Sequence, residues 1–112
     1  MTVKERNRKI KALLSKEFGR ENVRVRGERG TVYGWVRVLI TRPKPPKGEC
    51  VKPESWPFPY YICDDGKRIR EQTINRVWQL LKESGLYEEL SFYYDDMGDK
   101  RKEIIIEVEL VE

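Results

Sequence analysis

The sequence contains no histidine, which is the most common general base in enzymes. Serine and cysteine nucleophiles are usually activated by a neighbouring histidine, so neither arrangement is available here. The phosphate-binding signatures GxxxxGK[ST] and GxGxxG are also missing. These absences predict a protein that is not an enzyme and needs no cofactor.

Cysteine is scarce, since only Cys50 and Cys63 occur. In a reducing cytoplasm we expect two free thiols, with one loop-closing disulfide as the alternative. Two cysteines without histidine leave a zinc site short of ligands. Asp95, Asp96 and Asp99 lack the spacing of a calcium loop and are typical of a polar turn. The sequence therefore predicts no metal site.

Long hydrophobic runs are missing too. No stretch approaches the roughly 18 apolar residues of a membrane span, and the charged start lacks the apolar core of a signal peptide. We therefore expect a soluble, cytoplasmic protein without a membrane partner. Charged residues make up 38% of the chain, which together with few cysteines also suits a thermophilic source.

The charges are present in quantity but are divided unevenly along the chain. Residues 1–49 contain 14 Lys and Arg against 5 Asp and Glu, whereas residues 50–112 contain 9 against 14. A net charge of +9 is thus followed by one of −5. A basic half of this kind is typical of proteins that meet nucleic acid or an acidic protein surface.

The first half predicts a helix followed by a β-hairpin. Thr2 and Glu5 form a capping box, and apolar residues recur at helical spacing up to Gly19, which predicts a helix over about residues 3–18. Residues 23–26 and 31–40 alternate around a glycine-containing turn. The set expected to face inward is Val23, Val25, Val32, Val36, Val38 and Ile40. The set expected on the outer face is Arg24, Arg26, Tyr33, Trp35 and Arg37.

The second half repeats this order after a proline-rich connector, residues 41–63, which holds all six prolines. A short edge strand is expected at residues 60–62, and Asp64 and Asp65 are expected to cap a helix over about residues 68–84. A second hairpin is expected from residues 90–94 and 103–111 around the tip 95–100. Its inward set is Leu90, Phe92, Tyr94, Ile104, Ile106, Val108 and Leu110.

The order αββ, connector, αββ predicts an α+β fold in a single domain, residues 1–112, with pseudo-repeat units at about 3–40 and 68–111. Two such units bury their apolar faces by joining their hairpins. We therefore expect a four-stranded antiparallel sheet with two helices packed on one face.

The basic half supplies the candidate nucleic-acid contacts. Arginines interleaved with aromatic side chains suit phosphate contact and base stacking, and a basic helix attracts phosphate without regard to sequence. The candidates are Arg6, Arg8, Lys9, Lys11, Lys16, Arg20, Arg24, Arg26, Tyr33, Trp35, Arg37, Arg42 and Lys44. Two alternatives remain open: the arginines pair with Glu103, Glu107 or Glu109 across the sheet, or the connector covers Tyr33 and Trp35.

Residues 10–38, with Leu14, Phe18, VRVR at 23–26 and GTVYGWVRV at 30–38, resemble a small domain of large polyvalent proteins of phages and conjugative elements. There too a basic helix precedes a strand, a turn and a second strand. YDDMG at 94–98 is similar to a segment of uncharacterised stand-alone proteins. The resemblance implies a mobile-element context and transfers no catalytic residue.

The expected function is therefore that of a small non-enzymatic binding protein of a phage or other mobile element, which contacts nucleic acid through its basic N-terminal half. The alternative is a protein interaction module, or an inhibitor of a host factor, that uses its dipolar surface. Either a monomer or a homodimer is compatible with the sequence.

Overall fold

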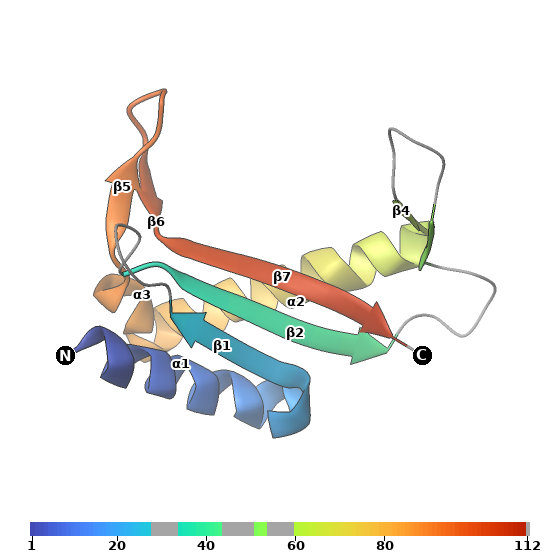
Figure 1. The fold of residues 1–112 in the computed structure, drawn as a ribbon, viewed down its shortest axis with the longest axis horizontal. Coiled ribbons are helices and arrows are strands. Elements are labelled where there is room, and N and C mark those ends of the chain that lie inside the picture. The colour runs from blue at the N-terminus through green and yellow to red at the C-terminus, as the bar shows by residue number, and fades with distance from the viewer. Residues whose placement is uncertain (28–33, 44–50, 54–59, 112) are drawn as a thin grey trace.

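The structure is a computed structural model that describes residues 1–27, 34–43, 51–53 and 60–111, with only the backbone described at 51–53 and 60–62. Helix α1 (Val3–Phe18) is followed by a 3-10 turn (Arg20–Asn22) and strands β1 (Val23–Gly27) and β2 (Val36–Pro43). After β3 (Val51–Pro53) and β4 (Tyr60–Ile62) come α2 (Asp64–Ser84) and α3 (Leu86–Glu89). Strands β5 (Phe92–Tyr94), β6 (Lys100–Lys102) and β7 (Ile104–Val111) complete the chain (Figure 1). The predicted α+β class is confirmed.

Helix α1 begins and ends where the sequence predicts. The Thr2 hydroxyl accepts a hydrogen bond from the backbone N–H of Glu5 at 3.1 Å, which satisfies one of the unpaired amides of the first turn. Gly19 ends the helix with a φ of 91°, a backbone conformation that favours glycine. Ile10 and Leu14 lie on one face and are fully buried.

Helix α2 begins four residues earlier than predicted. Cys63 is its N-cap, and its Sγ accepts a hydrogen bond from the N–H of Gly66 at 3.3 Å. Asp64 and Asp65 therefore belong to the first helical turn, where their carboxylates face the positive end of the helix dipole. Cys63 is disulfide-bonded, so the expectation of a free thiol is wrong at this residue; Cys50 lies outside the described residues.

The main sheet has three strands in the order β1-β2-β7, and the predicted four-stranded antiparallel sheet is wrong. β1 is antiparallel to β2, as expected, but β7 is parallel to β2. A parallel neighbour requires a long crossover connection, and the chain between β2 and β7 supplies one that contains α2. Figure 1 shows β7 and β2 side by side and pointing the same way.

The second hairpin is separate from this sheet because β5 pairs with β6 rather than with β7. Tyr94 lies opposite Lys100, so the pairing partner of β5 comes directly after the tip. This short hairpin projects away from the sheet at the end where β7 begins (Figure 1). Phe92 and Tyr94, predicted to face the core, are 48% and 66% exposed.

Both helices cover one face of the main sheet. α1 packs against β1 and α2 against β7. The alternation of β2 buries Val36, Val38 and Ile40 against the helices, as predicted, together with Leu14 of α1 and Leu81 of α2. β3 and β4 form a separate antiparallel pair, so the expected strand at residues 60–62 is present. Among the described helices, none is both long and apolar enough to cross a membrane.

Candidate nucleic-acid interface

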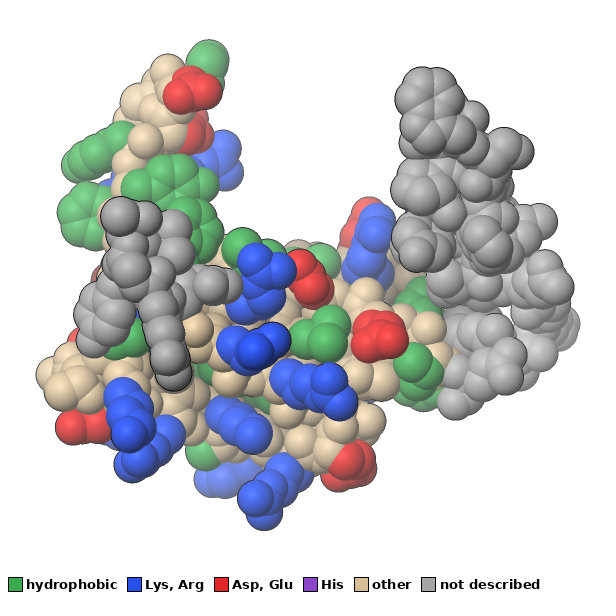
Figure 2. All heavy atoms as spheres, in the orientation of Figure 1, with side chains coloured by type: hydrophobic (Ala, Val, Ile, Leu, Met, Phe, Trp, Pro, Cys, Tyr) green, Lys and Arg blue, Asp and Glu red, His purple; other side chains and the backbone are tan. Residues whose placement is uncertain are grey.

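The face of the main sheet opposite the helices carries exposed arginines. Arg24, Arg26 and Arg37 alternate with the inward valines, and all three side chains are exposed. The register places Arg26 directly opposite Arg37, and Arg24 opposite Leu39. Figure 2 shows this face, with Lys and Arg side chains gathered over β1, β2 and α1. We call it the open basic face.

The open basic face is hollowed along β1. The hollow has a volume of about 480 Å³. Lys11 of α1, which lies beside β1, joins the three arginines in its lining. Leu39 and Val25 supply apolar surface, and Glu107 is the one carboxylate among the described lining residues. A hollow with four cations and one carboxylate favours an anionic ligand.

The charges on this face are only partly paired. The guanidinium of Arg37 lies 3.6 Å from the Glu107 carboxylate, with both side chains about half exposed. An exposed pair of this kind contributes little to stability, between 0 and about 1 kcal/mol. Within the described part of the chain, neither Arg24 nor Arg26 forms an ion pair. Cross-strand pairing with glutamate, one of the open alternatives, is therefore found at Arg37 and not at its two neighbours.

The Arg26–Arg37 juxtaposition costs stability in the absence of an anion. Like charges directly opposite each other on neighbouring strands repel. The parallel placement of β7 brings Glu107 next to Leu39 and diagonally to Arg37, where it offsets part of this repulsion. A phosphate between Arg26 and Arg37 would offset more of it, because charge-assisted hydrogen bonds from arginine to phosphate are among the stronger polar contacts.

Trp35 is not an open stacking platform. Its ring lies 5.3 Å from that of Tyr93, at an interplanar angle of 35°, and the residue is half-buried. The contact joins β5 to the start of β2, so a hairpin residue covers part of Trp35. Tyr33, the other predicted aromatic, lies outside the described residues.

Among the described residues, the exposed aromatic side chains are Phe92, Tyr93 and Tyr94 of β5, and sequence reasoning assigned Phe92 and Tyr94 to the core. Phe92 and Tyr94 pack edge to face at 5.8 Å, and the ammonium of Lys100 lies 4.0 Å from the centre of the Phe92 ring. Met97 at the tip is 86% exposed. The run Lys100–Lys102 directly after the tip is the signal that could have revealed a short, solvent-exposed hairpin.

Asp95 holds the tip of the hairpin together through its carboxylate. Its carboxylate accepts hydrogen bonds from the N–H groups of Met97 and Asp99 and from the guanidinium of Arg101, each at 2.9 Å. Arg101, followed by these backbone donors, lowers the pKa of Asp95 below its usual value. No group of three or more potential metal ligands occurs within the residues that the structure describes.

The basic residues of α1 do not form one patch. Arg8, Lys9, Lys11 and Lys16 of α1 are exposed, as is Arg20 of the 3-10 turn that follows. Lys11 lies beside β1 and lines the open basic face. Lys9 and Lys16 line a different hollow with residues 84–86, between α1 and the end of α2. Of the basic residues of α1, Lys11 is the one among the described lining residues of the open basic face.

Arg6 belongs to the interior, so its assignment to the basic surface is wrong. It is only 2% exposed. Its guanidinium donates to the carbonyl of Gly34 at 2.9 Å and to Oδ1 of Asn7 at 3.0 and 3.1 Å. The residue therefore ties α1 to the segment that precedes β2.

Arg42 is likewise turned away from the open basic face. It continues the inward alternation of β2, and its guanidinium lies 5.5 Å from the centre of the Phe18 ring of α1. Its Nε is buried, and no described residue gives it a hydrogen-bond partner. Lys44, the last of the predicted contacts, lies outside the described residues.

The chain matches no protein-family model, and no curated protein or solved structure was found that matches it.

Proposed function

We propose that this protein is a small non-enzymatic protein that binds single-stranded nucleic acid on the open basic face and the β5–β6 hairpin. The observation that carries the proposal is the placement of Arg26 opposite Arg37, with Arg24 and Lys11 in the same hollow and one carboxylate among them. Such a cluster is unfavourable alone and favourable around a phosphate backbone.

The β5–β6 hairpin supplies aromatic surface for base stacking, which the arginines lack. Unpaired bases stack on aromatic side chains whatever their identity, with about 1–3 kcal/mol per base. Phe92 and Tyr94 are exposed on one strand and flanked by Lys100. A strand whose phosphates lie on β1 and β2 would reach these rings at the end of the sheet where β7 begins. The proposal keeps the mobile-element context implied by the resemblance of residues 10–38.

The test separates binding from folding through Arg26→Glu. The change removes the repulsion with Arg37 and places opposite charges across the strands, so the melting temperature should stay the same or rise. Affinity for a fluorescently labelled 12-nucleotide single strand at 50 mM salt should fall about tenfold or more, because a phosphate contact is replaced by a carboxylate. The wild-type affinity should also drop steeply between 50 and 200 mM salt.

The matched control is Lys67→Glu, which changes the net charge equally at an exposed site of α2. It should lower the affinity much less than Arg26→Glu does. Equal losses for the two variants would show that only the net charge matters, and no binding by the wild type at 50 mM salt would refute the proposal.

The hairpin has its own pair of variants. Tyr94→Ala should weaken binding about fivefold or more, because it removes one stacking surface. Met97→Ala, at the still more exposed tip, should leave it unchanged.

A protein interaction module is the second candidate, and the exposed rings of Phe92 and Tyr94 with Met97 favour it. Exposed aromatic and methionine side chains on a projecting element are typical of protein contact surfaces. In that case the wild type would show no affinity for the strand, and any partner contact, including inhibition of a host factor, would depend on Tyr94 and not on Arg26.

A further inference from the structure

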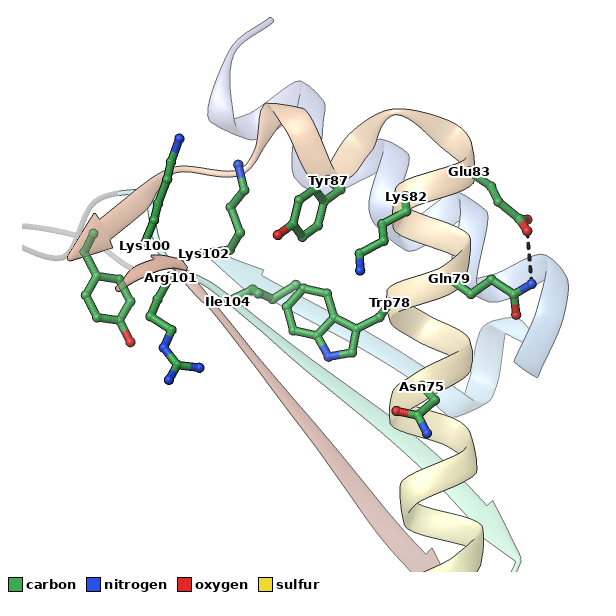
Figure 3. Close-up of a pocket in the computed structure, with 11 residues that line it drawn as sticks. Asn75, Trp78, Gln79, Lys82, Glu83, Tyr87, Lys100, Arg101, Lys102 and Ile104 are labelled. Carbon is green, nitrogen blue, oxygen red and sulfur yellow. Dashed lines mark hydrogen bonds between the residues drawn. The ribbon is translucent and has the colours of Figure 1, made fainter. Parts of the chain in front are cut away.

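A second hollow, separate from the open basic face, lies between α2 and the β5–β6 hairpin (Figure 3). Its volume is about 820 Å³, within the range of sites for small molecules. Trp78 and Lys82 of α2 and Tyr87 of α3 line one side of it. Residues 100–102 of β6 line the other, and the half-buried indole of Trp78 lies toward the buried Ile104. We call this hollow the α2–β6 pocket.

The α2–β6 pocket is strongly cationic although it lies in the acidic half of the chain. Its lining includes Lys82, Lys100, Arg101 and Lys102. Arg101 is paired with Asp95 at 2.9 Å. Within the described residues, none of the three lysines has a carboxylate partner. Glu83 is the one carboxylate among the described lining residues, and it accepts a hydrogen bond from the amide of Gln79 at 3.0 Å.

Two of these lysines converge on the same ring. The ammonium groups of Lys82 and Lys102 lie 5.3 and 4.9 Å from the centre of Tyr87. One comes from a helix and the other from a strand, and Lys102 also donates to the carbonyl of Leu90 at 3.3 Å. Figure 3 shows the two ammonium groups on either side of the Tyr87 ring, and the attraction of an exposed cation to a ring is weak. A phosphate in the pocket would offer the ammonium of Lys82 a stronger, charge-assisted contact than the ring does.

The other residues that line the pocket suit the base of a nucleotide. The rings of Trp78 and Tyr93 offer apolar surface on which a base can lie. Asn75, one turn before Trp78 on α2, carries an amide that can both donate to and accept from a base edge. We propose that the α2–β6 pocket binds a single nucleotide unit, with its phosphate against Lys82 and its base against Trp78.

The inference is tested by calorimetric titration of the intact protein with adenosine 5′-monophosphate, adenosine and inorganic phosphate. The nucleotide should bind with a 1:1 stoichiometry and about tenfold or more tighter than either fragment, because each fragment satisfies only one part of the pocket. No heat of binding at millimolar nucleotide, or equal affinity for inorganic phosphate, would overturn it.

Lys82→Glu is the diagnostic variant because Lys82 is exposed and its loss spares the core. It should raise the dissociation constant for the nucleotide about tenfold or more, since a charge-assisted contact becomes a repulsive one. Lys67→Glu, on the same helix but outside the pocket, should leave it unchanged. Equal affinity of the two variants, with both folded by circular dichroism, would overturn the inference.

A free nucleotide and the end of a bound strand share this chemistry. Comparison of a 5′-phosphorylated 12-nucleotide strand with its unphosphorylated form distinguishes them: a preference for the phosphorylated strand that disappears in Lys82→Glu identifies a strand end, and no preference identifies a free nucleotide. The pocket is also separable from the open basic face, because Arg26→Glu should weaken strand binding and leave nucleotide binding intact.

Discussion

The buried side chain of Arg6 is predicted to stabilise the folded protein. Replacement by methionine keeps much of the apolar stem and removes the guanidinium. The carbonyl of Gly34, which accepts from Arg6 at 2.9 Å in a buried position, then loses a charged donor. The exposed side chain of Arg8, two residues later on α1, provides a control with the same change in net charge.

The magnitude follows from the contacts. A hydrogen bond that involves a charged group contributes about 1.5–3 kcal/mol, and a buried carbonyl left without a partner costs about 1–3 kcal/mol. The bonds to Asn7 are only partly buried, so water can replace them at small cost. We therefore expect Arg6→Met to lower the free energy of unfolding by about 1.5–3 kcal/mol. Arg8→Met should change it by less than about 0.5 kcal/mol.

Urea unfolding followed by far-ultraviolet circular dichroism measures both variants. For a chain of this size a loss of 1 kcal/mol lowers the melting temperature by roughly 4 °C, so Arg6→Met should melt about 6–12 °C below the wild type. The folded fraction of Arg6→Met should retain its affinity for a single strand, because the residue does not reach the surface. Equal stability of the two variants, or a loss of binding in Arg6→Met alone, would refute the assignment of Arg6 to the interior.

Two further predictions concern the backbone and the pH dependence. Gly34 has a φ of 107°, and an added Cβ would lie 3.0 Å from Oγ of Ser91, so Gly34→Ala should cost about 2–3 kcal/mol in urea unfolding. Gly85→Ala, with a φ of 81° but no atom within 4 Å of the added Cβ, should cost only the backbone strain of about 1–2 kcal/mol. In the second prediction, the hydrogen bond from Arg76 holds the pKa of Glu17 below its usual 4.5. This depressed pKa contributes stability that is present above about pH 4.5 and is lost as the pH falls through the folded-state pKa. Wild type and Glu17→Gln should therefore differ in denaturant midpoint at pH 7 and converge toward pH 3; a constant difference would contradict this.

Local chemistry explains what could be predicted. The cap at Thr2 and the apolar spacing of Ile10 and Leu14 define α1 because helical contacts join residues three and four apart. The alternation of β1 and β2 shows which residues share a face, because successive side chains of a strand point to opposite faces of the sheet. Arg42 continues the inward set of β2, so this alternation also contained the signal that it faces the helices.

The second hairpin could not be predicted because alternation identifies the face of a strand and not its neighbour. Residues 104–111 suit an antiparallel partner at β5 as well as a parallel one at β2. Two backbone hydrogen bonds at Glu103 mark the change from one partner strand to the other. The N–H of Glu103 donates to the carbonyl of Ser91 at 2.8 Å, and its carbonyl accepts from the N–H of Val36 at 3.1 Å. The chain leaves the short hairpin at this residue and joins the main sheet.

The basic face of the first hairpin follows from the order of the amino acids alone, because the arginines of β1 and β2 alternate with valines at the period of two that strands share. The tertiary structure is needed to place Arg6 inside and Glu107 beside Arg37. It is also needed to bring Lys82 and Lys102, 20 positions apart in the sequence, to the same Tyr87 ring. These outcomes depend on contacts between distant segments, which arise from the packing of helices on the sheet and from the parallel crossover, and no local period encodes either.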